Sequence, residues 1–126
     1  MNINDIVEKY LKLKPISLDG TWTVNVNGDI NLNYESPAVE ADFTFLFYKD
    51  IDYFNYINIH RQVTPERSGY GSPLLHEIEK SFSELSNEFD KNTRIAFEIS
   101  SFQPHTKDWL LKNNYTIKDG LYVKKF

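Results

Sequence analysis

The sequence contains no cysteine, and this absence excludes disulfides, thiolate metal ligands and cysteine nucleophiles. It has no apolar run of about 18 residues, the length that a membrane-spanning helix needs, and its first residues lack the basic and then apolar order of a secretory leader. Its 3 histidines show neither H-x-x-H nor H-x-x-x-H spacing, so no metal site is expected. We therefore expect a soluble, cytoplasmic protein that binds no metal.

Positive charge is also scarce. Lysine and arginine together number 14, against 18 aspartates and glutamates, which gives a formal net charge of −4. Such a chain has no general attraction to nucleic-acid phosphates or anionic membranes, and its densest basic pair, Lys124-Lys125, suits a solvated strand end. Neither nucleic acid nor a membrane is expected as a partner. The scarce arginine beside frequent asparagine and lysine indicates an AT-rich bacterial or phage genome.

The apolar content is sufficient for one packed domain, since 40% of the 126 residues are hydrophobic and 15% are aromatic. Apolar residues recur at helical spacing in 1–15, alternate along four strands within 20–63, and return to helical spacing after a turn in 64–91. A strand, a helix opened by Pro104 and a terminal hairpin complete the pattern over 92–126. This order predicts a single α+β (α/β) domain with a mixed, mostly antiparallel sheet of about seven strands flanked by helices.

Cross-strand pairing predicts the register of two hairpins. In the first, a two-residue Asn27-Gly28 turn would place Val24 opposite Asn31, whereas a three-residue loop places Val24 opposite Leu32. The three-residue loop is favoured, because residues opposite each other share a face of the sheet. In the terminal hairpin, residues 118–120 are expected to form a three-residue loop with a glycine at positive φ.

The most informative segment is 66–75, Glu-Arg-Ser-Gly-Tyr-Gly-Ser-Pro-Leu-Leu, which joins a strand to the long helix. Its glycines let the backbone pass close to a ligand. The free N–H groups of the first helical turn, aided by the helix dipole, form a seat for phosphate oxygens. The segment therefore indicates anion binding. The alternative is a tight turn without a ligand, and in either case the side chain of Tyr70 is expected to pack.

With this segment the chain resembles the GNAT superfamily of acyl-CoA-dependent N-acyltransferases, whose signature Q/R-x-x-G-x-G/A lies at the same strand-to-helix junction. Residues 103–115 are similar to the family's later segment N-x-x-A-x-x-F-Y-x-x-x-G-F, with Asn114 expected to end the helix in a left-handed conformation. The resemblance spans about residues 20–126. It implies a GNAT-like acyl-CoA acyltransferase fold with acetyl-CoA as the cofactor.

The resemblance also implies which residues hold acetyl-CoA. The pyrophosphate would lie at the strand-to-helix junction, the pantetheine arm would bond to the amide of Gln103, and a backbone N–H near Val63 would polarise the thioester carbonyl. The cofactor-binding residues expected on this basis are Val63, Arg67, Ser68, Gly69, Tyr70, Gly71, Ser72 and Gln103.

Several departures from the family pattern bear on the chemistry. Glu66 stands where the family prefers Gln or Arg, although the neighbouring Arg67 supplies a cation. Leu110 falls where many members carry the Tyr that protonates the departing thiolate, and Asn55 falls near the position of a glutamate found in some members. The N-terminal part has one helix where the family usually has a strand and two helices. The resemblance therefore assigns neither the proton donor nor the general base.

Two side chains are candidates for the acid–base chemistry that acyl transfer to an amine requires. His60 lies on the expected fourth strand near the junction, and an imidazole titrates near neutral pH. Glu98 lies on the following strand, where it would face the cleft between the splayed fourth and fifth strands. Their structural alternatives are an exposed strand histidine and a solvated carboxylate. His105 is expected at the surface. The aromatic row of Phe43, Phe45 and Phe47 is expected in the core, with the wall of an acceptor pocket as its alternative.

Three functions are open at this point. The first is an N-acyltransferase that moves an acetyl group from acetyl-CoA to an amine, of a protein or of a small molecule, by direct attack. The second is a catalytically inactive GNAT-fold binding or inhibitor protein that acts through protein–protein contacts. The third is an unrelated α+β domain whose G-x-G arises by chance. An exposed strand edge beside the splay would also support a homodimer.

Overall fold

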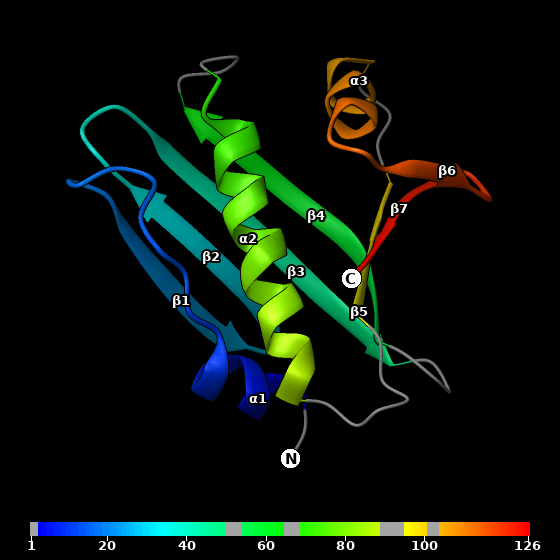
Figure 1. Ribbon diagram of the computed structural model, residues 1–126, viewed down its shortest axis with the longest axis horizontal. Helices are drawn as coiled ribbons and strands as arrows, with labels where there is room; N and C mark the ends of the chain where they lie inside the picture. Colours follow the sequence, from blue (N-terminus) through cyan, green and yellow to red (C-terminus); the bar gives the residue numbers. More distant parts are fainter. Residues whose placement is uncertain (1–2, 50–53, 65–68, 89–94, 101–103) are drawn as a thin grey trace.

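The computed structural model describes residues 3–49, 54–64, 69–88, 95–100 and 104–126 (Figure 1). Its helices and strands confirm the mixed α+β class expected from the sequence. In chain order the elements are α1 (Ile3–Tyr10), β1 (Thr21–Asn27), β2 (Asp29–Glu35), β3 (Glu40–Lys49), β4 (Phe54–Thr64), α2 (Gly71–Leu85), the 3₁₀ helix η1 (Ser86–Glu88), β5 (Ile95–Ile99), α3 (Pro104–Lys112), β6 (Thr116–Lys118) and β7 (Leu121–Lys125). None of these described helices is long and apolar enough to cross a membrane.

The described strands form one sheet of 7 strands in the order β1-β2-β3-β4-β5-β7-β6. Neighbours are antiparallel except β4 and β5, which run parallel. Strands β1 to β4 lie side by side in chain order, and α2 carries the chain from β4 to β5, because parallel strands need such a crossover. The last strand, β7, then inserts between β5 and β6.

The first hairpin has the register that cross-strand pairing favours. Val24 lies opposite Leu32 and Val26 lies opposite Ile30, which confirms the three-residue loop. Gly28, in the middle of that loop, has a φ of 81°, a conformation that residues with a Cβ rarely adopt.

The prediction of a three-residue loop in the terminal hairpin is wrong. Lys118 pairs with Leu121, so the turn consists of Asp119 and Gly120, which both have positive φ. These are the backbone angles of a type I′ turn, which an Asp-Gly pair strongly favours. In this register Ile117 lies opposite Tyr122 in place of Leu121, so it keeps an aromatic partner while the turn takes its preferred form.

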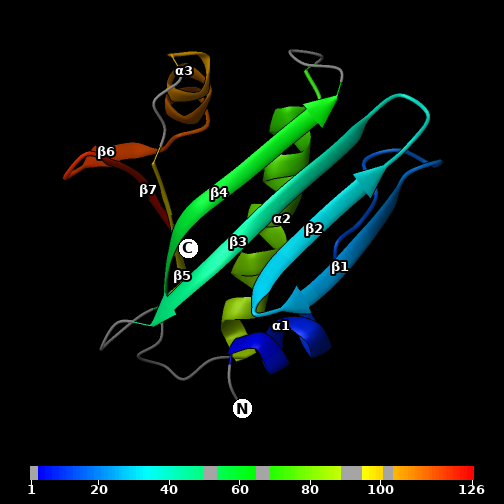
Figure 2. The same ribbon diagram turned by 180° about the vertical axis from the view of Figure 1, so that it is seen from behind.

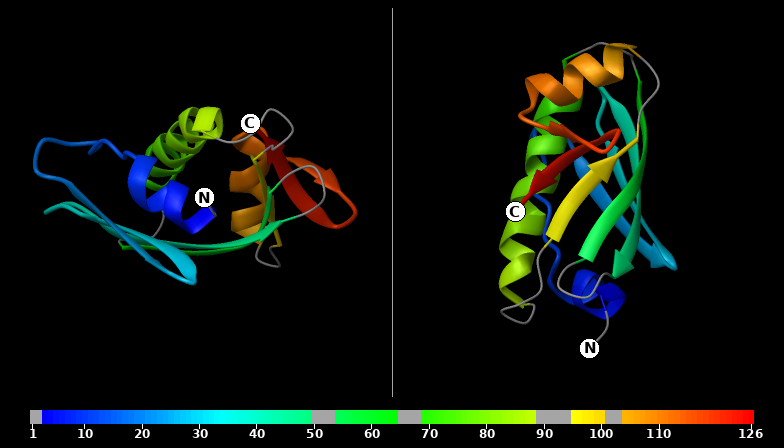
Figure 3. Two further views of the ribbon diagram at one scale, coloured as in Figure 1. Left: turned by 90° about the horizontal axis from the view of Figure 1, so that it is seen from below. Right: turned by 90° about the vertical axis from the view of Figure 1, so that its right-hand side faces the viewer.

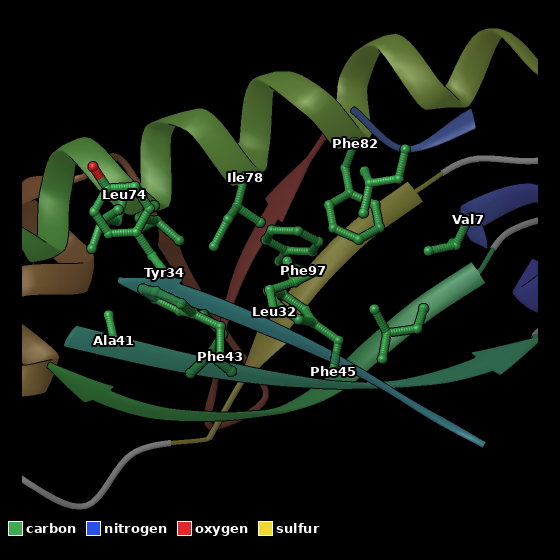
Figure 4. Packing of buried hydrophobic residues seen from close by; sticks show 14 of the residues in the cluster. Val7, Leu32, Tyr34, Ala41, Phe43, Phe45, Leu74, Ile78, Phe82 and Phe97 are labelled. Carbon is green, nitrogen blue, oxygen red and sulfur yellow. The ribbon is translucent and has the colours of Figure 1, made fainter. Parts of the chain in front are cut away.

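The hydrophobic core lies between α2 and one face of the sheet. The left view of Figure 3 shows α1 and α2 on the same, concave side of the curved strands. Apolar side chains at helical spacing point from α2 toward the strands (Figure 4). The buried apolar residues of α2 are Leu74, Leu75, Ile78, Phe82 and Leu85, and the strand residues beneath them are Ile30, Leu32, Tyr34, Ala41, Phe43 and Phe45. The expectation that Phe43 and Phe45 belong to the core is confirmed, and the side chain of Phe47 lies outside the described part.

Three phenylalanines connect β3, α2 and β5 at the centre of this core. The ring centroids of Phe45 and Phe82 lie 5.5 Å apart, and each lies 5.3 Å from the ring of Phe97. Phe126 adds an edge-to-face contact to Phe97, with the centroids 4.8 Å apart. Such tilted and edge-on arrangements are the favoured geometries of aromatic pairs, so this aromatic cluster holds β5 against the helix and β3.

A buried carboxylate anchors the terminal hairpin to α2. Glu79, on the helix, is 6% exposed and accepts hydrogen bonds at 3.0 Å from the hydroxyl of Tyr115 and the ammonium group of Lys124. The ammonium group also donates to the carbonyl oxygen of Asn113 at 3.0 Å. These contacts satisfy a charge that would otherwise be costly to bury.

The end of α3 has a left-handed cap. Asn114 has a φ of 71°, as predicted, and its N–H donates to the carbonyl oxygen of Leu111. The N–H of Tyr115 donates to the carbonyl oxygen of Leu110, which completes a Schellman motif. The side chains of Leu110 and Tyr115 are both buried, and an apolar contact of this kind commonly accompanies the motif.

On β2 and β3 the opposite face of the sheet is polar, and in the left view of Figure 3 no described helix lies on that side. Asn33 donates to the carboxylate of Asp42 at 2.8 Å, and Asn31 donates to the hydroxyl of Thr44 at 3.0 Å. These residues alternate along β2 and β3 with the buried ones, as expected for a sheet with one solvated side. The term outer face is used below for this side.

Gly20 leads into β1 and is packed against the end of the Tyr34 ring. A Cβ on Gly20 would overlap the hydroxyl group and ring carbons of Tyr34. The hydroxyl is held in place by a 2.8 Å hydrogen bond with Ser17, so the ring cannot move away without losing that contact.

We expect Gly20→Ala to lower the free energy of unfolding by about 1–3 kcal/mol, because it overpacks a filled site. Urea denaturation of the wild type and the variant measures this loss. Gly28→Ala is the control at the other end of β1, since its Cβ meets nothing within 4 Å and only its φ is strained. An equal loss from Gly20→Ala in wild-type and Tyr34→Leu backgrounds would contradict the steric explanation.

Candidate functional site

β4 and β5 meet at one end only. Past this end, β4 continues to Thr64 and β5 continues to Ile99. No further described residues of β4 and β5 pair with each other. Figure 2 shows the two strands moving apart in this direction. Ligands commonly bind beyond the carboxyl ends of parallel strands where an α/β sheet opens, so this β4–β5 divergence is the candidate site. The paired residues are Phe54 with Ile95, Asn55 with Ala96 and Tyr56 with Phe97.

β4 is irregular at the point where it leaves β5. On β3, Phe45 lies opposite Ile59 while Phe47 lies opposite Tyr56, so β4 contains one residue more than β3 between these two pairs. An extra residue of this kind is a β-bulge, which leaves backbone groups out of the regular ladder and often lies beside an active site. The bulge therefore offers backbone groups at the start of the β4–β5 divergence.

The first turn of α2 follows the carboxyl end of β4. The helix begins at Gly71, and the N–H of Leu74 bonds to the carbonyl oxygen of Tyr70 at 3.2 Å. Pro73 has no N–H, and the N–H groups of Gly71 and Ser72 have no acceptor within the described ranges. No acidic residue lies in this turn. Two backbone donors and the positive end of the helix dipole can therefore serve an anion.

The hydroxyl of Ser72 is engaged with α3. It accepts hydrogen bonds from the indole N–H of Trp109 at 2.9 Å and from the side-chain amide of Asn113 at 3.2 Å. Asn113 is 5% exposed, and its amide also donates to the carbonyl oxygen of Trp109 at 2.7 Å. This network joins the start of α2 to the end of α3. The hydroxyl oxygen accepts both bonds, so the donors that Ser72 can offer to an anion are its backbone N–H and the O–H proton of its side chain.

The residues expected to bind the cofactor have different places in the structure. Val63 pairs with Ala41 near the end of β4, and Gly69 has a φ of 86° in the turn before α2. The side chain of Tyr70 packs against the core, as expected. Gly71 and Ser72 form the first turn of the helix, whereas Arg67, Ser68 and Gln103, together with Glu66, lie outside the described residues.

The structure does not bring the two catalytic candidates together. His60 pairs in the register with Thr44, a position of the outer face. Glu98 is half-buried and follows Phe97, which points into the core, so it also lies on the outer face. Since Tyr56 is level with Phe97, His60 lies about three residues, on the order of 10 Å, farther along its strand than Glu98.

Three further residues singled out in the sequence, Leu110, His105 and Asn55, lie in different surroundings. Leu110 is 0% exposed and belongs to the core, and His105 is exposed, as expected. Asn55 lies on β4 between its register partners Tyr48 and Ala96. Within the described ranges, no group of histidine and acidic residues could hold a metal ion.

Sequence reasoning missed two features of the site. The bulge had a signal, because the apolar residues of β4 change parity between Tyr56 and Ile57. No sequence pattern predicts the hydrogen bonds of Ser72, since Ser72 is separated from Trp109 by 37 residues and from Asn113 by 41.

Comparison with known proteins finds no matching family model, no matching curated protein and no matching solved structure. The function of this chain is therefore inferred from the residues and the geometry of the candidate site.

Ser72→Ala should lower the free energy of unfolding by about 1–2 kcal/mol, because it removes an acceptor from two donors, one of them almost completely buried. Thermal and urea denaturation measure the loss. Ser83→Ala is the matched control, because Ser83 is exposed on the same helix and should change stability by less than about 0.5 kcal/mol. Equal losses in the two variants would show that the network contributes nothing to the junction of α2 and α3.

Proposed function

We propose that the protein is a GNAT-type N-acetyltransferase that moves an acetyl group from acetyl-CoA to an amine. The observation that carries this proposal is the β4–β5 divergence, together with the N-terminus of α2 after β4, whose first turn contains no acidic residue. An acyl-CoA has the two features that match it, a pyrophosphate for the helix end and a thin pantetheine arm for the space between two strands. The cytoplasmic location expected from the sequence belongs to the same proposal.

The arrangement of the strands supports this reading. The GNAT resemblance implies a mostly antiparallel sheet of about seven strands, flanked by helices, in which the fourth and fifth strands splay. The described sheet has 7 strands, and its parallel pair, β4 and β5, is the one that separates. The turn and helix that carry the G-x-G segment follow β4 directly.

The pyrophosphate would lie against the N–H groups of Gly71 and Ser72. Backbone donors at a helix start bind phosphate oxygens without a side chain, so the engagement of the Ser72 hydroxyl with α3 is no obstacle. Arg67, Ser68, Gly69 and Tyr70 would contribute from the preceding turn, and Gln103 would bond to the pantetheine arm.

The reaction needs little from side chains. The amine nitrogen attacks the thioester carbonyl carbon, the C–N bond forms, the C–S bond breaks, and CoA leaves as a thiolate that takes a proton from water. A backbone N–H of β4, near Val63 or in the bulge between Tyr56 and Ile59, would stabilise the oxyanion. Positioning and this stabilisation supply much of the rate enhancement of such a transfer.

Proton removal from the amine would come from the outer face. His60 and Glu98 are the candidates there, and no described helix separates their positions from solvent. The N-terminal part has one helix, α1, where the family usually has a strand and two helices that shape the acceptor site. An open outer face of this kind suits a protein amine as well as a small one.

A second candidate function is supported by Leu110. It aligns with the tyrosine that protonates the thiolate in many GNAT members, and it is completely buried, so it donates no proton and its position does not face a ligand. A GNAT-fold protein without this donor could act through protein–protein contacts alone, as a catalytically inactive binding or inhibitor protein.

We expect acetyl-CoA and CoA to bind with micromolar affinity in isothermal titration calorimetry. Gly71→Glu should abolish binding, because it adds a side chain and a negative charge at the phosphate seat. Ser83→Glu is the control, since it adds the same charge to an exposed site later in the same helix. Absence of binding to the folded wild type, or equal effects of the two variants, would contradict the cofactor site.

Turnover separates the two candidate functions. Release of free CoA thiol from acetyl-CoA, followed with a panel of peptide, polyamine and amino-acid acceptors, should depend on the acceptor and should fail in Gly71→Glu. If CoA binds but no acceptor of the panel is acetylated, the inactive binding protein becomes the better description.

A further inference from the structure

The first strand forms an open edge of the sheet. β1 pairs with β2 and lies at the end of the strand order, and Figures 1 and 2 show it at the margin of the sheet. No backbone hydrogen bond joins its free side to another described segment. Alternate residues of β1 therefore direct N–H and C=O groups to solvent along the whole strand.

This edge lacks the features with which natural sheets protect themselves. β1 has the sequence TWTVNVN, which contains no charged residue and no proline. Its pairing with β2 is regular over all 7 residues, with no bulge to twist the edge away. The opposite edge differs, because β6 has 3 residues and includes Lys118. A long, flat and uncharged edge is a template for a further strand.

Apolar side chains lie beside the open edge. Trp22, Val24 and Val26 are on the helix side of β1, opposite Tyr34, Leu32 and Ile30, which are all 0% exposed. Val24 itself is 37% exposed, and Leu18, two residues before the buried Gly20, is fully exposed. The segment before β1 covers part of this side, because Leu13 and Ile16 pack against the core and the indole N–H of Trp22 donates to the carbonyl oxygen of Lys14, whereas Val24 stays exposed.

We propose that β1 pairs with β1 of a second copy of this chain, antiparallel about a two-fold axis at Val24. In this register Val24 faces Val24 and Trp22 faces Val26, while on the outer face Thr23 faces Asn25 and Thr21 faces Asn27. Every apolar residue therefore meets an apolar one and every polar residue a polar one, which is the pairing that a sheet with one buried face requires. The two sheets would become one.

The charge and symmetry of the strand favour a second copy as the occupant. β1 contains no charged residue, so no like charges meet within the paired strands. A two-fold contact also closes on itself, so it gives a dimer and not a fibre. The nearest charges in the extended register are Asp19 and Asp29, which would face each other at both ends of the paired strands. Salt screens the repulsion between them, so the dimer should become tighter as ionic strength rises.

Single cysteines test the axis directly, because the chain has no cysteine of its own. In the proposed dimer two copies of Val24→Cys have their Cα atoms roughly 4.5–5.5 Å apart, within the range of a disulfide. Two copies of Val26→Cys are separated by about 13 Å along the strands and cannot be joined. Mild oxidation should convert Val24→Cys, and not Val26→Cys, to a disulfide-linked dimer, with at least a tenfold difference in yield.

Sedimentation equilibrium of the unmodified chain gives the second readout, with a dimer expected. Val24→Lys should weaken the dimer by about tenfold or more, since two ammonium groups would meet at the axis. Ile117→Lys, an equal change at an exposed site on the other edge strand, should leave it unchanged. A monomer at millimolar concentration, equal cross-linking of both cysteine variants, or a dimer weakened by Ile117→Lys and not by Val24→Lys would each overturn the proposal. None of these readouts depends on acetyl-CoA, so the dimer and the proposed activity can fail independently.

Discussion

The contact among Phe45, Phe82 and Phe97 is the constraint on which the shape of the sheet depends. These rings come from β3, α2 and β5 and lie 5.3 to 5.5 Å apart, so they hold β5 close to the helix at one level of the sheet. β4 pairs with β5 at that same level, through Tyr56 and Phe97, and departs from it immediately afterwards. A parallel pair fixed at one end and bulged at the other has to diverge.

The contacts around the divergence keep it in a defined geometry. Glu79 ties α2 to the terminal hairpin through Tyr115 and Lys124, so β7 stays beside β5. Ser72 ties the first turn of the same helix to α3. One helix thus presents its buried stripe to the sheet, its carboxylate to the hairpin and its first two N–H groups to the candidate site. A site built from backbone groups needs this rigidity, because backbone donors can be aimed only by the elements that contain them.

Local sequence patterns predict most of the helices and strands of the fold, but they predict little of the candidate site. Alternation in β1 and β2 is enough to choose the loop of their hairpin, because a wrong register would bury Asn31 against Val24. The same reasoning failed at Asp119-Gly120, because the preference of this pair for a type I′ turn sets the register and Ile117 has an aromatic partner, Tyr122, in the observed pairing. The parity change after Tyr56 was a readable sign of the bulge. The partners of Ser72 and Glu79 could not be read, because they are brought together only by the packing of distant segments.

The uncovered outer face connects the two proposals. A two-fold axis perpendicular to the sheet, as β1 pairing requires, leaves the outer faces of both copies on the same side. The positions of His60 and Glu98 of both copies would then lie on one side of the joined sheet, and helices α1 and α2 of both copies would lie on the other. In the proposed enzyme, an acceptor would therefore approach either divergence from the outer face, on the side opposite the proposed place of the pyrophosphate. If both proposals hold, the two acetyl-transfer sites of the dimer would accept acceptors from the same side of the joined sheet.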